Sequence, residues 1–177
     1  MGYKEIVLLA VTGCCLFLSG CMDMNSVKPK EAVPDWVQKV PREKGRLCAV
    51  GASEPTYFRE DARKYASENA RGELAHSLHV DIKSIMVDIT TERGGDIAEG
   101  SIIEASSWAS EAALKESEIT SFWYDEEGVA PVRKKGVSYA LACMPLKNTA
   151  QGISEKLSDT ADTGTILDRL YKKVGSR

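Results

Sequence analysis

The chain has 177 residues, of which 43% are hydrophobic and 28% are charged, and its formal net charge at pH 7 is −3. This length accommodates one domain of ordinary size, and the apolar fraction is sufficient for a packed core. Proteins that bind nucleic acid usually carry a basic excess. The slightly acidic balance therefore excludes nucleic acid from the expected partners.

The N-terminus carries the most specific motif of the sequence. A short polar start is followed by an uncharged apolar run over residues 6–18, which is shorter than the roughly 20 residues needed to span a bilayer. Such a run is typical of the apolar part of a signal peptide. It ends in Leu18, Ser19, Gly20 and Cys21, which is the pattern of a bacterial lipoprotein signal.

This pattern gives Cys21 a chemical role. We expect residues 1–20 to be cleaved off and the Cys21 thiol to carry a thioether-linked diacylglycerol, because two or more acyl chains anchor a protein stably in a membrane. Met22 follows the cysteine, and by the sorting rule of enteric bacteria this predicts the outer membrane, with the domain facing the periplasm. The alternative is an ordinary signal peptide whose apolar run happens to contain cysteines.

Two cysteines remain beyond this anchor, Cys48 and Cys143. Outside the cytoplasmic membrane such a pair can oxidise to a disulfide. The bond requires Cα atoms about 4.4–6.8 Å apart, which the sequence does not determine. The alternative is two buried thiols that act as small hydrophobic side chains.

The predicted elements begin after a polar tether over residues 21–33. The proline, tryptophan and valine of residues 34–37 mark the expected start of the domain, and a glycine-ended apolar run over 46–51 predicts a strand. Residues 58–78 carry an apolar stripe at helical spacing, in which alanines would let the helix lie close to a sheet. The stripe consists of Phe58, Ala62, Tyr65, Ala66, Ala70, Leu74 and Leu78.

Residues 80–91 are rich in β-branched side chains and predict a second strand. Its alternation slips near Ser84, which a bulge or a change of environment along the strand would explain. Residues 92–96 contain two glycines and predict a turn. A second alanine-rich stripe over 98–112 predicts another helix.

The C-terminal half predicts a hairpin followed by helices. Strands are expected over 118–124 and 132–144, with a helix after Pro145, a linker over 158–164 and a last helix from Thr165. The second of these strands is expected to have a large-residue face, with Tyr139 and Leu141, and a small-residue face, with Ala140 and Ala142. The fold class is therefore α+β, a small and mostly antiparallel sheet of about four strands with helices on it, in the order β-α-β-α-β-β-α. We expect an α+β domain over residues 34–147 and a helical C-terminal tail over 148–177.

Several of these stretches resemble one family. They are Pro34-Asp35-Trp36-Val37, the strand CAVGAS at 48–53, the alanine-rich helix over 62–75 and the closing strand 138–142 with Met144-Pro145. In these features the chain resembles the lipoprotein-20 family of bacterial envelope proteins, which includes flagellar outer-membrane lipoproteins that assemble into rings. The resemblance implies a non-catalytic role in the cell envelope. It supplies no catalytic residue and no cofactor.

Residues suited to catalysis or metal binding are few. His76 and His79 are the only histidines, and their spacing can place two ligands on one face of a helix. A zinc site needs at least a third ligand, and no nearby residue completes the set. We expect both histidines to lie at a helix end and to interact with terminal carbonyls. No metal, cofactor or catalytic set is predicted.

The predicted hairpin offers the best candidates for an interaction surface. Phe122, Trp123 and Tyr124 place bulky side chains on both faces of one strand, so that one face is core and the other, if uncovered, is a contact surface. Helices on both faces are the alternative. Acidic residues 125–127 are expected to pair with basic residues 133–135 across the hairpin. The alternative for these charges is a polar rim around a partner.

The sequence therefore predicts an envelope lipoprotein without enzymatic activity. Its expected role is structural, and its expected partners are the membrane, through the lipid, and other envelope proteins or copies of itself. The alternative is a module that binds cell-wall polymer or regulates an envelope enzyme.

Overall fold

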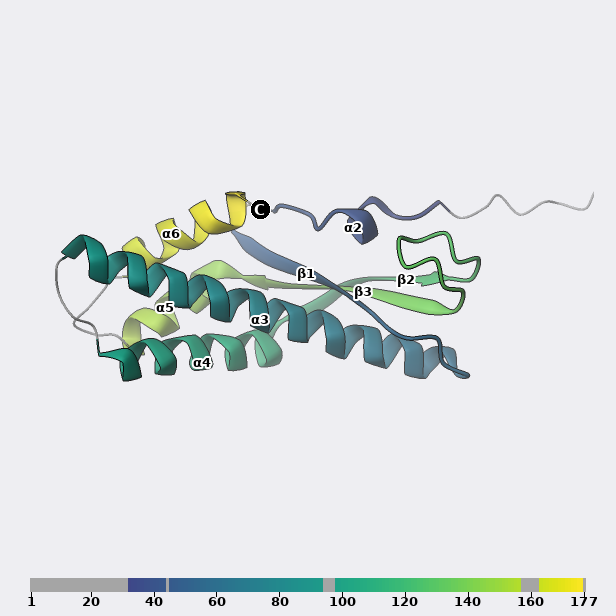
Figure 1. Cartoon of the computed structure of the whole chain (residues 1–177), viewed down its shortest axis with the longest axis horizontal. Helices are drawn as coiled ribbons and strands as arrows, with labels where there is room; N and C mark the ends of the chain where they lie inside the picture. Colours follow the sequence, from purple (N-terminus) through teal and green to yellow (C-terminus); the bar gives the residue numbers. More distant parts are fainter. Residues whose placement is uncertain (1–31, 44, 94–97, 157–162, 177) are drawn as a thin grey trace, which may run out of the picture. The chain divides into compact units, whose positions relative to one another are not determined.

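We describe the fold from a computed structural model, which describes residues 32–43, 45–93, 98–156 and 163–176. Val33–Arg177 forms one compact unit. Its elements follow the order α-β-α-α-β-β-α-α (Figure 1). They are α2 (Asp35–Gln38), β1 (Arg46–Ala52), α3 (Arg59–Arg93), α4 (Glu99–Glu116), β2 (Glu118–Asp125), β3 (Val137–Pro145), α5 (Leu146–Lys156) and α6 (Thr163–Ser176).

The sheet has three strands in the order β1-β3-β2, and both pairings are antiparallel. The predicted α+β class and the β2–β3 hairpin are confirmed. The sheet has one strand fewer than expected in the described part of the chain, and the order of elements differs accordingly. β3 is buried along nearly its whole length because it lies between the other two strands.

The missing strand is the second half of α3, so the prediction of a strand over residues 80–91 is wrong. α3 is one helix of 35 residues, and it buries Leu78, Ile82, Ile85 and Ile89 at helical spacing. β-branched residues lower helix propensity by less than about 1 kcal/mol each. Burying an isoleucine side chain contributes about 2 kcal/mol, and a helix that has already formed propagates without a new nucleus.

The first half of α3 lies against the sheet, where the predicted alanine stripe is confirmed. Ala62, Ala66 and Ala70 are fully buried, whereas the stripe's aromatic members Phe58 and Tyr65 are exposed. Gly51 of β1 faces this stripe. A Cβ atom at Gly51 would lie 2.0 Å from the backbone N of Ala70, so only glycine permits this distance between strand and helix.

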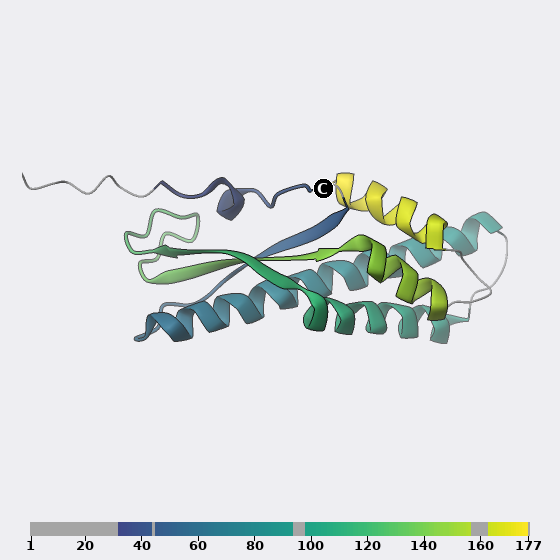
Figure 2. The same ribbon diagram turned by 180° about the vertical axis from the view of Figure 1, so that it is seen from behind.

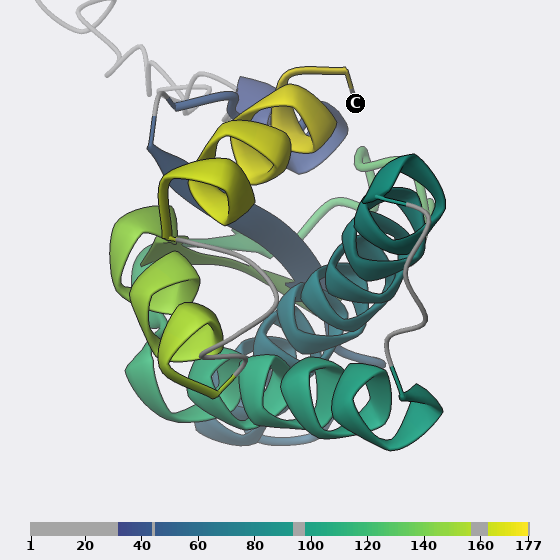
Figure 3. The same cartoon turned by 90° about the vertical axis from the view of Figure 1, so that its left-hand side faces the viewer.

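The second half of α3 packs with α4, α5 and α6 around a shared core (Figure 3). Ile153 of α5 and Ile166 and Leu170 of α6 are fully buried in it. Figure 2 shows α5 continuing directly from β3. The boundary expected at residues 147/148 therefore does not separate two units, and the C-terminal helices belong to the domain. The predicted linker at 158–164 lies largely outside the described residues, as does much of the predicted turn at 92–96.

An ion pair connects α6 to the C-terminal end of α3. Arg169 donates hydrogen bonds to the carboxylate of Glu92, and this contact raises the pKa of the Arg169 guanidinium. On the opposite side of the same helical group, Trp108 of α4 packs against Gly152 of α5. Trp108 is thus partly buried between helices.

The other face of the sheet is covered by the short N-terminal segment around α2. Trp123 of β2 and Tyr139 of β3 form a small cluster there with Trp36 and Val37. A neighbouring cluster contains Leu141 and both cysteines, and Trp36 packs against it as well. The predicted separation of β3 into a large-residue face and a small-residue face is confirmed.

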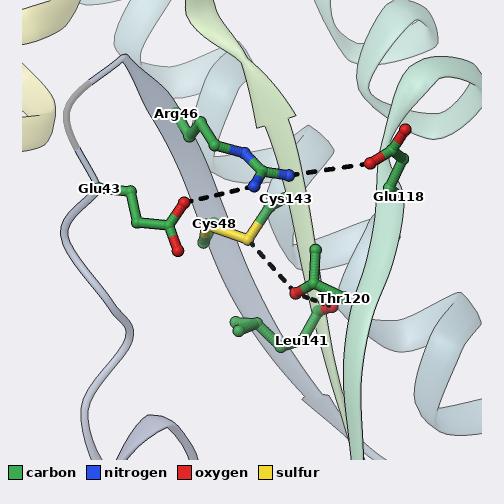
Figure 4. Close-up of polar contacts among 7 residues, drawn as sticks. All are labelled: Glu43, Arg46, Cys48, Glu118, Thr120, Leu141 and Cys143. Carbon is green, nitrogen blue, oxygen red and sulfur yellow. Dashed lines mark hydrogen bonds and ion pairs between the residues drawn. A yellow bond between two sulfur atoms is a disulfide. The ribbon is translucent and has the colours of Figure 1, made fainter.

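Cys48 and Cys143 are joined by a disulfide between β1 and β3 (Figure 4). The two residues are directly opposite in the antiparallel ladder, and their Cα atoms are 4.1 Å apart. This short separation is typical of a cross-strand pair that exchanges no backbone hydrogen bonds. The bond closes a sequence separation of 95 residues, and thus links the first strand of the domain to the last.

The hairpin loop is organised by Asp125, not by the predicted charge pairs. The Asp125 carboxylate is fully buried and accepts hydrogen bonds from the backbone N–H groups of Gly128, Val129 and Ala130 at 2.7, 2.9 and 2.8 Å. Lys134 pairs instead with Glu54, at 2.8 Å. β3 consequently starts at Val137, five residues later than predicted, because the intervening residues form this loop.

We predict that Asp125→Asn lowers the free energy of unfolding by about 2 kcal/mol. An asparagine oxygen can accept some of these bonds, but its amide group would face a buried backbone N–H and leave it unpaired. Urea unfolding of the variant checks this value. Asp35→Asn, at an exposed acidic position, serves as the control; equal stability of the two variants would contradict the role of Asp125.

Candidate functional site

The three predicted interface residues of β2 do not share one environment. Trp123 is 7% exposed and belongs to the cluster beneath α2, so it is core and not accessible surface. Phe122 and Tyr124 point to the other face, and Phe122 remains 40% exposed. Because side chains alternate along a strand, only Phe122 and Tyr124 can contribute to one contact surface.

Two arginines of α3 lie over these two rings. The guanidinium carbon of Arg59 is 4.3 Å from the ring centroid of Tyr124, and that of Arg63 is 4.3 Å from the ring centroid of Phe122. Four residues of helix rise about 6 Å, and two residues of strand rise about 6.8 Å. The matching rises allow two successive cation–π contacts between α3 and β2.

Two exposed aromatic residues precede this pair of contacts at the start of α3. Tyr57 is 94% exposed and Phe58 is 60% exposed, and their rings meet edge to face with centroids 4.9 Å apart. The hydroxyl of Thr56 donates to the carbonyl of Phe58 at 2.6 Å, which fixes the backbone before the helix. The aromatic-arginine surface consists of Tyr57, Phe58, Arg59, Arg63, Phe122 and Tyr124.

A cavity of about 390 Å³ opens between α3 and β2 within this surface. Arg59, Arg63, Phe122 and Tyr124 line it, together with Glu60 and Ser138. Ser138 is 1% exposed, and its hydroxyl has no hydrogen-bond partner among the residues that the structure describes. Chemically, the cavity offers guanidinium groups, aromatic faces and one buried hydroxyl to a polar group of a partner.

Tyr139 lies in the cluster beneath α2. Burial raises the pKa of the Tyr139 hydroxyl, and the negative charge of Asp125 raises it further. The rings of Tyr139 and Trp123 lie 5.6 Å apart at a directly paired position of the sheet. These aromatic residues pack on the face of the sheet opposite to Phe122 and Tyr124.

The histidines lie elsewhere, in the middle of α3, so the expectation of a helix end is wrong. Helix continues beyond them to Arg93. The Nδ1 atom of His79 is 3.4 Å from the hydroxyl oxygen of Ser110 in α4. Within the described ranges, no group of three or more histidine, cysteine or acidic side chains could hold a metal ion.

The predicted anchor, Leu18, Ser19, Gly20 and Cys21, lies outside the described residues. None of the helices that the structure describes combines the length and the apolar character needed to cross a membrane.

The sequence interpretation missed most of the aromatic-arginine surface. It placed Phe58 in the apolar stripe of the helix and did not include Arg59 or Arg63 among the candidate interface residues. Two signals were available, the dipeptide Tyr57-Phe58 directly before the helix and the spacing of four between Arg59 and Arg63. Their meaning depends on β2 lying beside the start of α3, which no local pattern encodes.

Comparison of the chain with protein-family models, curated proteins and solved structures found no match.

Proposed function

We propose that this chain is a lipid-anchored envelope protein of the lipoprotein-20 type, without enzymatic activity, whose domain binds another envelope protein or a second copy of itself. The lipid on Cys21 holds it at the outer membrane, with the domain in the periplasm. The protein acts by presenting the aromatic-arginine surface at the membrane.

The observation that carries this proposal is the exposure of Tyr57 and Phe58 beside two ordered arginines. Aromatic and arginine side chains dominate the energetics of protein interfaces, because they bury a large area at low conformational cost. The cation–π contacts hold both guanidinium groups in place before binding, and this reduces the entropy lost on association.

We predict that Cys21→Ser abolishes the incorporation of labelled palmitate and releases the protein from the membrane fraction, because serine provides no thiol for the thioether. Cys15→Ser is the matched control, since Cys15 lies in the segment expected to be cleaved. Lipid labelling that persists in Cys21→Ser would overturn the anchor assignment.

We predict that Phe58→Ala and Arg63→Ala each weaken association with the partner about tenfold or more, while the free energy of unfolding changes by about 1 kcal/mol or less. Both side chains are exposed, and an exposed cation–π contact contributes only about 0.5–1 kcal/mol to stability. Lys64→Ala is the control, because Lys64 is an exposed basic residue of the same helix. Thermal unfolding gives the effect on stability.

Two binding measurements identify the class of partner. Native mass spectrometry of the lipid-free protein reports self-association, and a species that is dimeric in the wild type but monomeric in Arg63→Ala identifies a second copy as the partner. Co-sedimentation with isolated peptidoglycan tests the cell-wall alternative. Sedimentation that is equal for wild type and Arg63→Ala would show that the wall does not use this surface.

A further inference from the structure

The sheet has an open edge at β1, on the side away from β3. The hydrogen bonds that flank the β1–β3 ladder are Leu146 N–H to Gly45 O, at 2.9 Å, and Ser53 N–H to Ser138 O, at 2.9 Å. The register between them has no shift. In an antiparallel pair the bonded residues alternate, so the odd-numbered residues of β1 bond to β3 and the even-numbered ones point outward.

Cys48 and Val50 therefore direct their backbone N–H and C=O groups away from the sheet. No backbone or side-chain group of the described chain is hydrogen-bonded to them. The edge is closed at both ends. The Arg46 N–H donates to Glu43 O at 3.1 Å, and the Asn69 side-chain amide donates to Ala52 O at 2.7 Å. The open stretch thus presents two donors and two acceptors in strand geometry.

The two edges of the sheet differ in the features that oppose the addition of another strand. β2, at the opposite edge, has a register irregularity at Thr120, and such bulges block the addition of a strand. β1 has neither a bulge nor a proline, and between Arg46 and Ala52 it carries no charge. The disulfide at Cys48 also holds β1 firmly to β3. β1 is therefore an edge held to its neighbour by a covalent bond and, between Arg46 and Ala52, lacking a bulge, a proline or a charge that would oppose strand addition.

Space is present beside this edge. The segment that carries Glu43 runs alongside β1 without joining the sheet (Figure 4), and a cavity of about 390 Å³ lies between residues 39–42 and 47–50. A second cavity of about 500 Å³ continues along Val50, Gly51 and Ala52. Val50 and Glu73 line both cavities, so the two form one groove along the strand.

The charged residues that line the groove favour a segment of a different protein over a second copy of this chain. Lys39 and Arg42 line one wall, and Glu68 and Glu73 of α3 line the other. A second copy paired through the same edge by a two-fold axis would bring the acidic walls of both α3 helices together, and like charges at such positions oppose association. An extended segment of a different protein, with acidic side chains toward Lys39 and Arg42, avoids this repulsion.

We propose that β1 accepts an extended segment of another protein as a fourth strand, which hydrogen-bonds to the backbone of Cys48 and Val50. Strand addition of this kind takes its affinity from main-chain hydrogen bonds and its specificity from alternate side chains. The groove is separate from the aromatic-arginine surface and does not depend on it.

The test begins with random linear peptides displayed on phage and selected on the full-length chain in detergent. Val50→Pro removes the outward N–H of Val50 and leaves the ladder to β3 intact, because an edge strand tolerates proline at such a position. Val50→Thr keeps that N–H and is the matched control. We expect the selected peptides to bind Val50→Pro about tenfold more weakly than Val50→Thr, the effect of one lost hydrogen bond.

A second measurement keeps the proposal testable if Val50→Pro fails to fold. In the wild-type chain without peptide, the amides of Cys48 and Val50 should exchange hydrogen faster than those of Leu47 and Ala49. A selected peptide should slow their exchange, and its analogue with N-methylated alternate amides should not. Selected peptides that bind both variants equally, or that leave exchange at Cys48 and Val50 unchanged, would overturn the proposal, as would a selection that yields no binder.

Discussion

Gly51→Ala is expected to lower the free energy of unfolding by about 3 kcal/mol or more. The added methyl group would lie 2.0 Å from the backbone N of Ala70 and 2.6 Å from the backbone O of Ala66. Neither atom belongs to a flexible side chain, so α3 as a whole would have to move away from β1. Overpacking of an interior costs about 1–3 kcal/mol even where side chains can adjust. Urea unfolding of the variant gives the value.

Gly72→Ala is the matched control for this prediction. Gly72 lies in the same helix, and a Cβ atom there would have no neighbour within 4 Å. Because alanine has the higher helix propensity, Gly72→Ala is expected to raise the free energy of unfolding by about 0.5–1 kcal/mol. Opposite signs for the two variants are the expected result. A Gly51→Ala variant as stable as the wild type would show that α3 does not approach β1 as described.

Loss of the disulfide is expected to have the largest effect, about 4–5 kcal/mol of stability. The bond closes a sequence separation of 95 residues, and the chain-entropy model assigns this stabilisation to a loop of such length. It also joins an edge strand to the central strand of the sheet, since Cys48 lies in β1 and Cys143 in β3. Urea unfolding with and without a thiol reductant measures the difference.

Comparison of the reduced wild type with the double variant Cys48→Ala/Cys143→Ala separates two contributions to stability, that of the covalent bond and that of the packed sulfur atoms. Reduction leaves both sulfur atoms buried between β1, β3 and Trp36, whereas the double variant also removes them. The reduced protein should therefore show most of the loss, and the double variant slightly more. A reduced protein within about 1 kcal/mol of the oxidised one would contradict the structural importance of this bond.

Where one local pattern dominates, the sequence was sufficient to predict the structure. The alanines at 62, 66 and 70 predicted the close approach of α3 to the sheet, because small residues at helical spacing have little other use. The alternation of Tyr139 and Leu141 with Ala140 and Ala142 predicted the two faces of β3, because side chains of a strand point alternately to opposite sides.

Where local preference and tertiary context disagree, the prediction failed. Residues 80–91 have the composition of a strand, but Ile82, Ile85 and Ile89 continue the buried stripe of α3 without an intervening glycine or proline. In the sequence, Asp125 is one of three consecutive acidic residues. Its burial, and the hydrogen bonds that it accepts from three backbone N–H groups, follow only from the path of the loop.

The candidate site could be predicted only in part for the same reason. Phe122 and Tyr124 were identified as interface candidates, whereas Arg59 and Arg63 were not. The arginines acquire their role only because α3 and β2, separated in sequence by α4, lie side by side. Trp123, the third candidate, is buried because it alternates with its neighbours on the strand.

Photo-cross-linking in intact cells tests the central claim most directly, that the aromatic-arginine surface binds a protein at the membrane. A photoreactive phenylalanine replaces Tyr57, which is 94% exposed, and in a control chain it replaces Lys64. We predict one discrete cross-linked product from position 57, which is lost when Arg63→Ala or Cys21→Ser is added and is absent from position 64. No product from position 57, or the same product from both positions, would contradict the claim.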